Sequence, residues 1–418
     1  MYFPLTLVFA ALPILVAAVS LAGSPVSRGI SVPISKRGGL RGVRSLSVST
    51  SQTRLPYYHT CRKIGYRMVV YEQNTGRQHP LAGGLKPMGR RDSASETLID
   101  DSELWFGSIS IGTHVDSFTV NLDTASSDLF VPSFKCGSSC WGHKTYDPSA
   151  SAHSNDLGIP FTLTLGDSDI VTGEQYSDSI QVAGLTASAQ TLGLATSYSE
   201  GFQIGNFSAD GLMGMGFPSI SVFNAVPPLQ TLISENMLTS PVFGIKLATL
   251  GSDLFLGGVN NSLFTGDFSW VSLSNAGFWQ APFDAVIVNG TRIVGKTETI
   301  FDTGTMKILG DSAGIAKFFA SIHGANSAPE YGDGTYTIPC DFDTPISVWV
   351  GGTEVKISAA SFNLGPLQGS EDGTTCEAGA AADSTLTGEF WILGQIFLQN
   401  VYSAWDVGNL RIGFATLA

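Results

Sequence analysis

The fold of this 418-residue chain is decided by two short stretches, "TVNLDTASSDLF" at residues 119–130 and "ETIFDTGTMKIL" at residues 298–309. In each, an aspartate follows an apolar approach and precedes a threonine, a small residue and a second hydroxyl residue. One such turn means little, because Asp, Ser and Thr populate ordinary turns through local hydrogen bonds. A second copy indicates that the two aspartates work together.

The two aspartates are followed by the same feature at nearly the same distance. Gly214 in "DGLMGMG" lies 214 − 123 = 91 residues after Asp123, and Gly394 in "FWILGQI" lies 394 − 302 = 92 residues after Asp302. Two apolar residues precede the glycine in both places. The matched spacing predicts a duplicated unit of about 150 to 180 residues, with two similar lobes that face each other across a pseudo-twofold axis.

Two facing aspartates predict a specific chemistry. Carboxylates in close contact cannot both ionise freely, so one holds a proton while its neighbour is charged. Such a dyad supplies a base and an acid from identical side chains and titrates as a unit. The function that follows is activation of a water molecule to attack an amide carbonyl, with return of a proton to the leaving nitrogen. No cofactor is needed for this reaction.

Composition favours a mostly β protein. The chain has 48 glycines and only 14% charged residues. Short apolar runs rich in Val, Ile, Thr and Phe are broken by Gly, Asn, Asp and Ser, and few stretches show sustained helical periodicity.

Charge divides the chain at the dibasic pair Arg90-Arg91. Residues 1–91 hold 13 of the 22 Lys and Arg but only one of the 35 acidic residues, so residues 92–418 carry 9 − 34 = −25. A basic leader ahead of an acidic body predicts a propeptide held partly by charge and removed by processing. The alternative is a basic arm that stays attached and binds an anion. The acidic body would repel nucleic acid.

The first 22 residues form an apolar run that ends in small residues, which predicts a signal peptide cleaved after Ala22. An N-terminal membrane anchor is the alternative reading. Three sequons, at Asn206, Asn260 and Asn289, suit a secreted glycoprotein. We therefore expect an extracellular monomer without stable membrane association.

Cysteines predict disulfides. Cys61 lies in the leader, and the other four form an even set for which the sequence alone permits three pairings: Cys136, Cys140, Cys340 and Cys376. No His pair completes a metal site beside the CxxxC spacing, so we expect no bound metal.

From about residue 98 to the end, the chain resembles the pepsin-like aspartic proteases, most closely the secreted fungal members. The segments that carry the resemblance are "LWFGSISIGT", "DLFVPS", "ADGLMGMGFPSIS" and "FWILGQIFLQNVYSAWDVGNLRIGFA". The resemblance implies a bilobal β fold with the active-site cleft between the lobes, and peptide or protein substrates bound in extended conformation. The expected divisions are 1–22 signal peptide, 23–91 propeptide, 92–265 N-terminal lobe and 266–418 C-terminal lobe.

The resemblance also implies roles for particular residues. Asp123 and Asp302 would form the catalytic dyad, with Thr124 and Thr303 linking the two loops and Ser126 and Thr305 bonding the outer carboxylate oxygens. It implies disulfides Cys136–Cys140 and Cys340–Cys376. The residues implied to form the flap or to bind substrate are Leu165, Gly166, Asp167, Asn121, Phe130 and Leu212.

Three departures from the family pattern bear on activity. Ala125 stands where the first loop normally has glycine, a change that we expect to be tolerated because Ala keeps its N–H and C=O. Leu165 replaces the flap tyrosine and cannot donate a phenolic hydrogen bond. Met306 and Lys307 follow the second loop, and we expect Lys307 to point to solvent, because burying an unpaired charge is costly.

Two rival functions remain to be weighed. "GDSAG" at residues 310–314 matches a serine-hydrolase nucleophile motif, but the only later histidine, His323, lies too close in sequence. The simpler reading is that Asp311 or Ser312 caps a helix over the following residues. The other alternative is an inactive pepsin-like protein that binds peptides. The departures at Ala125 and Leu165 suggest it. Both aspartates and both hydroxyl partners are present, which favours an active enzyme.

Overall fold

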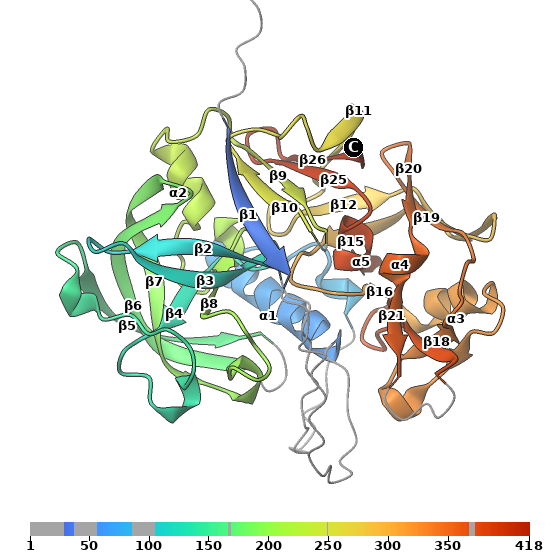
Figure 1. Cartoon of the computed structure of the whole chain (residues 1–418), viewed down its shortest axis with the longest axis horizontal. Helices are drawn as coiled ribbons and strands as arrows, with labels where there is room; N and C mark the ends of the chain where they lie inside the picture. Colours follow the sequence, from blue (N-terminus) through green and yellow to red (C-terminus); the bar gives the residue numbers. More distant parts are fainter. Residues whose placement is uncertain (1–28, 37–56, 86–104, 166–168, 249, 368–372) are drawn as a thin grey trace, which may run out of the picture.

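The computed structural model describes residues 29–36, 57–85, 105–165, 169–248, 250–367 and 373–418. The expected signal peptide, the Arg90-Arg91 pair, Gly166 and Asp167 lie outside the described residues. The described chain forms two β-rich lobes with α1 (Tyr57–Thr75) between them (Figure 1). The predicted mostly β, bilobal architecture is therefore confirmed.

Within the described residues, thirteen strands join into one sheet. Their spatial order is β11 (Phe264–Ser272), β26 (Arg411–Leu417), β25 (Tyr402–Asp406), β9 (Val242–Lys246), β10 (Ser252–Leu256), β1 (Ile30–Lys36), β2 (Trp105–Ile111), β3 (Asp116–Asp123), β8 (Gly211–Gly214), β4 (Leu129–Pro132), β7 (Leu185–Tyr198), β6 (Ile170–Val182) and β5 (Asn155–Thr164). Strand β11 contains residues 265 and 266, the expected division between the lobes.

The C-terminal half adds three smaller sheets. The first runs β12 (Gln280–Phe283), β15 (Thr297–Phe301), β24 (Phe390–Leu393), β16 (Ile308–Gly310) and β23 (Ala380–Ala382). The second runs β14 (Thr291–Val294), β13 (Ala285–Val288), β19 (Ile346–Val350) and β20 (Thr353–Ile357). The third runs β17 (Asn326–Ser327), β18 (Tyr336–Pro339), β22 (Thr375–Ala378) and β21 (Asn363–Pro366).

Helices are short except for α1. The others are α2 (Pro228–Ser234), α3 (Ser312–Ala320), α4 (Ala359–Phe362) and α5 (Gln395–Leu398). Helix α3 begins as the simpler reading of "GDSAG" predicts, because the Asp311 carboxylate accepts hydrogen bonds from the N–H groups of Ala313 and Gly314. No helix in the described part of the chain is long and apolar enough to cross a membrane.

The duplication predicted from Gly214 and Gly394 is visible in the strand pairing. Strand β8 runs parallel to β3 and places Gly214 opposite Asp123, and β24 runs parallel to β15 and places Leu393 opposite Phe301. The N–H of the residue after each glycine donates to one of the two aspartate turns, from Met215 to the Asp123 carbonyl (2.8 Å) and from Gln395 to the Thr305 carbonyl (2.7 Å). Each aspartate turn is thus braced from behind by a strand about 90 residues downstream.

The leader is part of this fold. Strand β1 lies between β10 and β2, and its Val32 and Ile34 are buried in the main hydrophobic core. Helix α1 buries Ile64 and Met68 in a second apolar cluster. The leader is therefore held by strand pairing and apolar contact as well as by charge.

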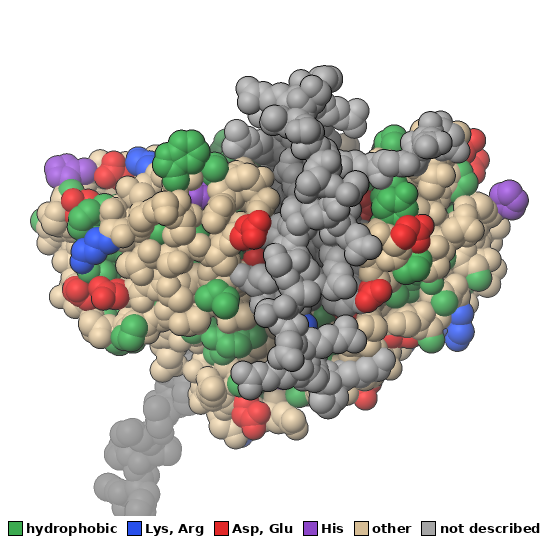
Figure 2. All heavy atoms as spheres, turned by 90° about the horizontal axis from the view of Figure 1, so that it is seen from below, with side chains coloured by type: hydrophobic (Ala, Val, Ile, Leu, Met, Phe, Trp, Pro, Cys, Tyr) green, Lys and Arg blue, Asp and Glu red, His purple; other side chains and the backbone are tan. Residues whose placement is uncertain are grey.

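Both disulfides implied by the resemblance form, Cys136–Cys140 and Cys340–Cys376, and Cys61 is buried and unpaired. Acidic side chains are spread over both lobes on the face shown in Figure 2, in keeping with the negative charge of residues 92–418.

Replacing Gly214 with Ala should destabilise the chain. A Cβ at this position would lie 2.5 Å from the backbone N and Cα of Ser127, so the strand behind the first aspartate turn must shift. We expect the free energy of unfolding to fall by about 1–3 kcal/mol, the usual cost of overpacking. Urea unfolding measures it, with Gly205→Ala as the control, because a Cβ at Gly205 meets nothing within 4 Å. Equal stability of the two variants would contradict the bracing role.

Candidate active site

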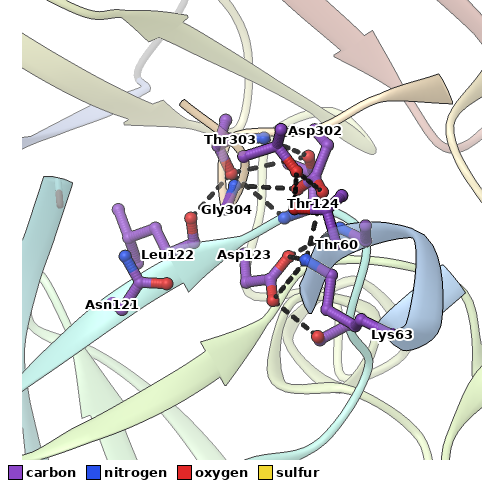
Figure 3. A network of polar contacts seen from close by, with 12 residues as sticks. Thr60, Lys63, Asn121, Leu122, Asp123, Thr124, Asp302, Thr303 and Gly304 are labelled. Atoms are coloured by element: carbon purple, nitrogen blue, oxygen red, sulfur yellow. Dashed lines mark hydrogen bonds and ion pairs between the residues drawn. The ribbon is translucent and has the colours of Figure 1, made fainter. Parts of the chain in front are cut away.

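Two turns, the first aspartate loop (residues 123–126) and the second aspartate loop (residues 302–305), meet between the lobes (Figure 3). The Thr124 N–H donates to Thr303 Oγ1 (3.1 Å), and the Thr303 N–H donates to Thr124 Oγ1 (3.0 Å). The Thr124 hydroxyl then donates to the Phe301 carbonyl, and the Thr303 hydroxyl donates to the Leu122 carbonyl. These reciprocal hydrogen bonds join the two lobes and fix the backbone positions of the two aspartates.

The two carboxylates have matching partners. Asp123 accepts from the Ala125 N–H at 2.9 Å and from Ser126 Oγ at 2.6 Å. Asp302 accepts from the Gly304 N–H at 2.8 Å and from Thr305 Oγ1 at 2.6 Å. Both aspartates are buried. Each side chain is therefore held in one orientation by one backbone donor and one hydroxyl, as the resemblance implies.

The third residue of each loop is under steric constraint. A Cβ at Gly304 would lie 2.7 Å from Asp123 Oδ1, so the second loop has no room for a side chain. The first loop accommodates Ala125, whose methyl is fully buried in the apolar cluster that includes Ile220 and Ile300. The expected tolerance of Ala125 agrees with this packing.

Lys63 of α1 reaches both aspartates. Its Nζ lies 3.2 Å from each carboxylate oxygen of Asp123 and 3.0 Å from Oδ2 of Asp302. Figure 3 shows the lysine side chain extending from the helix to the carboxylates, and the neighbouring Thr60 hydroxyl contacts Thr305 Oγ1 at 3.2 Å. One ammonium nitrogen within hydrogen-bond distance of both carboxylates places the two aspartates side by side. In the intact chain, Lys63 of the leader is hydrogen-bonded to carboxylate oxygens of both aspartates.

The three buried charges shift one another's pKa values. Burial raises the pKa of Asp123, but the Lys63 ammonium and the hydrogen bonds from Ser126 and Ala125 outweigh it, and the net pKa lies below the usual value. Burial also raises the pKa of Asp302, and the Asp123 charge raises it further against the opposing effect of Lys63, so its net pKa is raised. Burial lowers the pKa of Lys63, yet the two carboxylates reverse this and raise it.

These directions separate the two aspartates. As the pH falls, Asp302 takes up a proton first, because its pKa is raised, and Asp123 stays ionised longer. The arrangement can therefore hold one proton between two carboxyl groups, which is the condition for acid–base chemistry by a carboxylate pair.

The expected substrate-binding residues divide into two groups. Leu165, Phe130 and Leu212 lie together in one apolar cluster, with Leu165 only 8% exposed. Asn121 is not brought to the carboxylates, since its side-chain amide donates to the Trp105 carbonyl at 3.2 Å and lies to one side of Asp123 in Figure 3. The leader also contacts β5, the strand that leads to Leu165, because the Tyr66 hydroxyl donates to the Thr162 carbonyl at 3.2 Å.

Lys307 does not point to solvent, so that expectation is wrong. It is 4% exposed, and its ammonium donates to Glu377 Oε1 at 2.5 Å. The partner lies 70 residues downstream on β22, and no local sequence pattern predicts the contact. A buried lysine is permitted because it is paired.

The three sequons differ in their surroundings. Asn289 is exposed in the turn between β13 and β14, and its φ of 49° is in the left-handed region. Asn206 and Asn260 are partly buried, and their side-chain amides donate to the Glu200 carbonyl and to Asp253 respectively. Asn289 is therefore the sequon with the freest side chain.

Sequence reasoning missed the leader residues that enter the site. It predicted attraction between a basic leader and an acidic body but named no ion pair. The available signal was the spacing of Lys63 and Arg67 in "CRKIGYRMVVY", four residues apart and therefore on one face of a helix. Neither partner, Asp123 nor Asp128, can be deduced from that spacing.

The sequence of this chain is similar to those of known proteases. The family model described as "Eukaryotic aspartyl protease" matches residues 104–417. An aspartic protease of Phaffia rhodozyma is 35% identical over 81% of this chain and 82% of its own length. Cathepsin E-B of Xenopus laevis is 33% identical over 92% of this chain and 93% of its own length, and pepsin A of Sus scrofa is 31% identical over 78% and 84%.

The chain therefore belongs to the eukaryotic aspartyl protease family, and it is an aspartic-type endopeptidase of the pepsin-like class. The resemblance stated from the sequence is confirmed.

The reciprocal threonine bonds make a testable contribution to stability. Thr303→Val would leave the buried Leu122 carbonyl and the Thr124 N–H without a partner, at about 1–3 kcal/mol each. We expect the free energy of unfolding to fall by about 2–6 kcal/mol in urea titrations followed by tryptophan fluorescence. Thr303→Ser keeps the hydroxyl and serves as the matched control. If valine and serine proved equally stable, the loops would not depend on this hydroxyl.

Proposed function

We propose that this protein is a secreted endopeptidase that works at acid pH, with Asp123 and Asp302 as its catalytic dyad. The observation that carries the proposal is that one nitrogen, Lys63 Nζ, lies within 3.2 Å of both carboxylates. Each carboxylate also has the same pair of donors, a backbone N–H and a hydroxyl. The site is thus built from two equivalent halves.

The proposed reaction needs one proton shared between two carboxyl groups. The ionised aspartate accepts a proton from a water molecule, which attacks the carbonyl carbon of an extended peptide substrate. The protonated aspartate donates a hydrogen bond to the carbonyl oxygen, where negative charge develops. The proton taken from water then passes to the leaving nitrogen as the C–N bond breaks.

We further propose that residues 23–91 are a propeptide, removed at or near Arg90-Arg91, and that the intact chain is a latent zymogen. Lys63 occupies the polar atoms that a water molecule and a substrate carbonyl would need. Asp123 has a depressed pKa in the folded chain, so its stabilising contribution is present above its unfolded pKa and is lost as the pH falls through the folded value. Lys63, whose pKa is raised, stays charged throughout that acid range.

Acid therefore weakens the lysine contact from the carboxylate side. Protonation of Asp302, whose pKa is raised, removes its ion pair with Lys63, while Asp123, whose pKa is lowered, keeps its own. Acid also makes the net charge of −25 on residues 92–418 less negative, which weakens its attraction for the basic leader. The same protonation that releases the leader puts a proton on the dyad.

Secretion is supported by the apolar first 22 residues, the two disulfides and the sequons. The proposed mature enzyme is a monomer with an N-terminal lobe up to about residue 265 and a C-terminal lobe from 266 onward. The alternative function, a peptide-binding protein without activity, is disfavoured by the intact hydrogen bonds to both carboxylates. Digestion of denatured globin or casein in acid, with and without pepstatin, separates the two.

The dyad assignment predicts the effect of removing either carboxyl group. Asp123→Asn and Asp302→Asn should each lower kcat by at least about a hundredfold, because acid–base catalysis of this kind contributes about 10² to 10⁴. The double variant should lose little more than either single variant, because the two groups act as a unit. Steady-state hydrolysis of one chromogenic peptide by the activated enzyme measures this. A single variant with near wild-type turnover would refute the assignment.

The zymogen assignment predicts that Lys63→Gln reduces latency. Without the ammonium, both carboxylates lose their ion pairs with the leader. We expect the intact chain to hydrolyse a fluorogenic peptide at a higher pH than the wild-type zymogen, with intact mass confirming that no leader has been cut. Lys144→Gln is the control, because Lys144 is a half-exposed lysine that pairs with Asp116 at 3.6 Å. A Lys63→Gln chain as latent as the control would show that the lysine is dispensable.

A further inference from the structure

A second buried ion pair joins α1 to the protease part of the chain. Arg67 Nη1 pairs with Asp128 Oδ2, and neither side chain has any exposed surface. Arg67 lies four residues after Lys63, so the two cations project from the same face of the helix, about 6 Å apart along its axis. Asp128 lies five residues after Asp123, just before β4. The second pair is therefore next to the proposed dyad.

Asp128 is held in place by groups that do not belong to the leader. Its Oδ1 accepts from Ser221 Oγ at 2.7 Å and from the Phe223 N–H at 3.1 Å, and its Oδ2 accepts from the Val222 N–H at 3.1 Å. The donors come from one segment, which follows the 3-10 turn Pro218–Ile220. These bonds hold the carboxylate in one orientation without any contribution from the leader.

The leader supplies the positive charge at this position. Among the described residues, Arg67 is the ion-pair partner of Asp128, and Arg67 Nη1 also donates to the Ile220 carbonyl at 3.1 Å. Removing the leader takes away the cation but leaves a fixed carboxylate and a carbonyl oxygen facing the space that the guanidinium filled. A carboxylate held in this way can form a charge-assisted hydrogen bond with another cation that enters the space of the guanidinium.

We propose that, in the processed enzyme, Asp128 and the Ile220 carbonyl form a subsite that selects an arginine or lysine side chain of the peptide substrate. This inference rests on the proposed function, because it requires removal of the leader and binding of a peptide across the dyad. Lys63 and Arg67, which mark the dyad and the subsite, are about one helical turn apart along α1, so we expect the selected residue to be close in sequence to the scissile bond.

Both basic residues fit the subsite. Within the described residues, Arg67 Nε and Nη2 are buried without a hydrogen-bond partner, so the pocket offers two acceptors rather than a full clamp for guanidinium. A lysine ammonium satisfies two acceptors equally well. The neutral isostere citrulline has the shape of arginine without the charge, so it distinguishes a cation site from a pocket that selects length.

The test is a positional scan with the activated enzyme, after mass spectrometry has confirmed loss of the leader. Peptides that differ at one position carry Arg, Lys, citrulline or norleucine, and kcat/KM is measured at about pH 5, where ordinary carboxyl groups are ionised. At one position we expect Arg and Lys to exceed citrulline by about tenfold or more, the usual worth of a hydrogen bond to a charged group. In Asp128→Asn, that ratio should fall to about one.

Asp116→Asn is the matched control, because Asp116 is a half-exposed carboxylate at the far end of β3 from Asp123. It should keep the wild-type ratio. A ratio near one at every position of the wild-type scan would overturn the inference, and this outcome does not depend on whether Asp128→Asn folds. A preference that survives in Asp128→Asn would overturn the assignment to Asp128. Failure of the wild-type enzyme to cleave any peptide would instead refute the proposed function, and the subsite with it.

Discussion

The reciprocal hydrogen bonds between Thr124 and Thr303 are the constraint on which the rest of the structure depends. They join the two lobes at one point and orient both aspartate loops, because each threonine uses its N–H and its hydroxyl at once. Once the loops are fixed, the short distance between the carboxylates follows, and so does the need for Gly304, where a Cβ would strike Asp123. The strands behind the loops then have a defined surface to pack against.

Placing two carboxylates in a buried position is costly, and the intact chain offsets that cost with the leader. Lys63 neutralises the pair and Arg67 neutralises Asp128, so charges that would be buried alone are compensated. Of the leader's 13 basic residues, Lys63 and Arg67 form these buried ion pairs, and both lie in the middle of α1. Strand β1 and the apolar side chains of α1 supply the rest of the attachment. The ion pairs of Lys63 and Arg67 position α1, and the burial of its apolar side chains stabilises it in that position.

The two ion pairs of α1 differ in what they leave behind. At Asp123 and Asp302, the proposed removal of the leader would leave two neighbouring carboxyl groups that can share one proton. At Asp128, the carboxylate pairs with Arg67 and accepts three further hydrogen bonds from residues 221–223, which do not belong to the leader. The first position is therefore suited to acid–base chemistry and the second to binding a cation. One helix face covers both.

Much of the fold and the proposed dyad follows from sequence, because duplication and local turn chemistry are written along the chain. The two aspartate loops, the echo at Gly214 and Gly394 and the Asp311 helix cap each depend on residues that are close in sequence or regularly spaced. Sequence resemblance also implied the disulfide pairing.

Only the tertiary structure decided which distant groups meet. The pairs Lys63 with Asp302, Arg67 with Asp128 and Lys307 with Glu377 span 239, 61 and 70 residues, and no local pattern encodes them. The expectation for Lys307 was wrong for this reason. The sequence indicates that burying an unpaired lysine is costly, but it does not reveal Glu377, the partner that offsets this cost in the folded chain. Short-range rules set each turn, and long-range packing decided which charges are buried together.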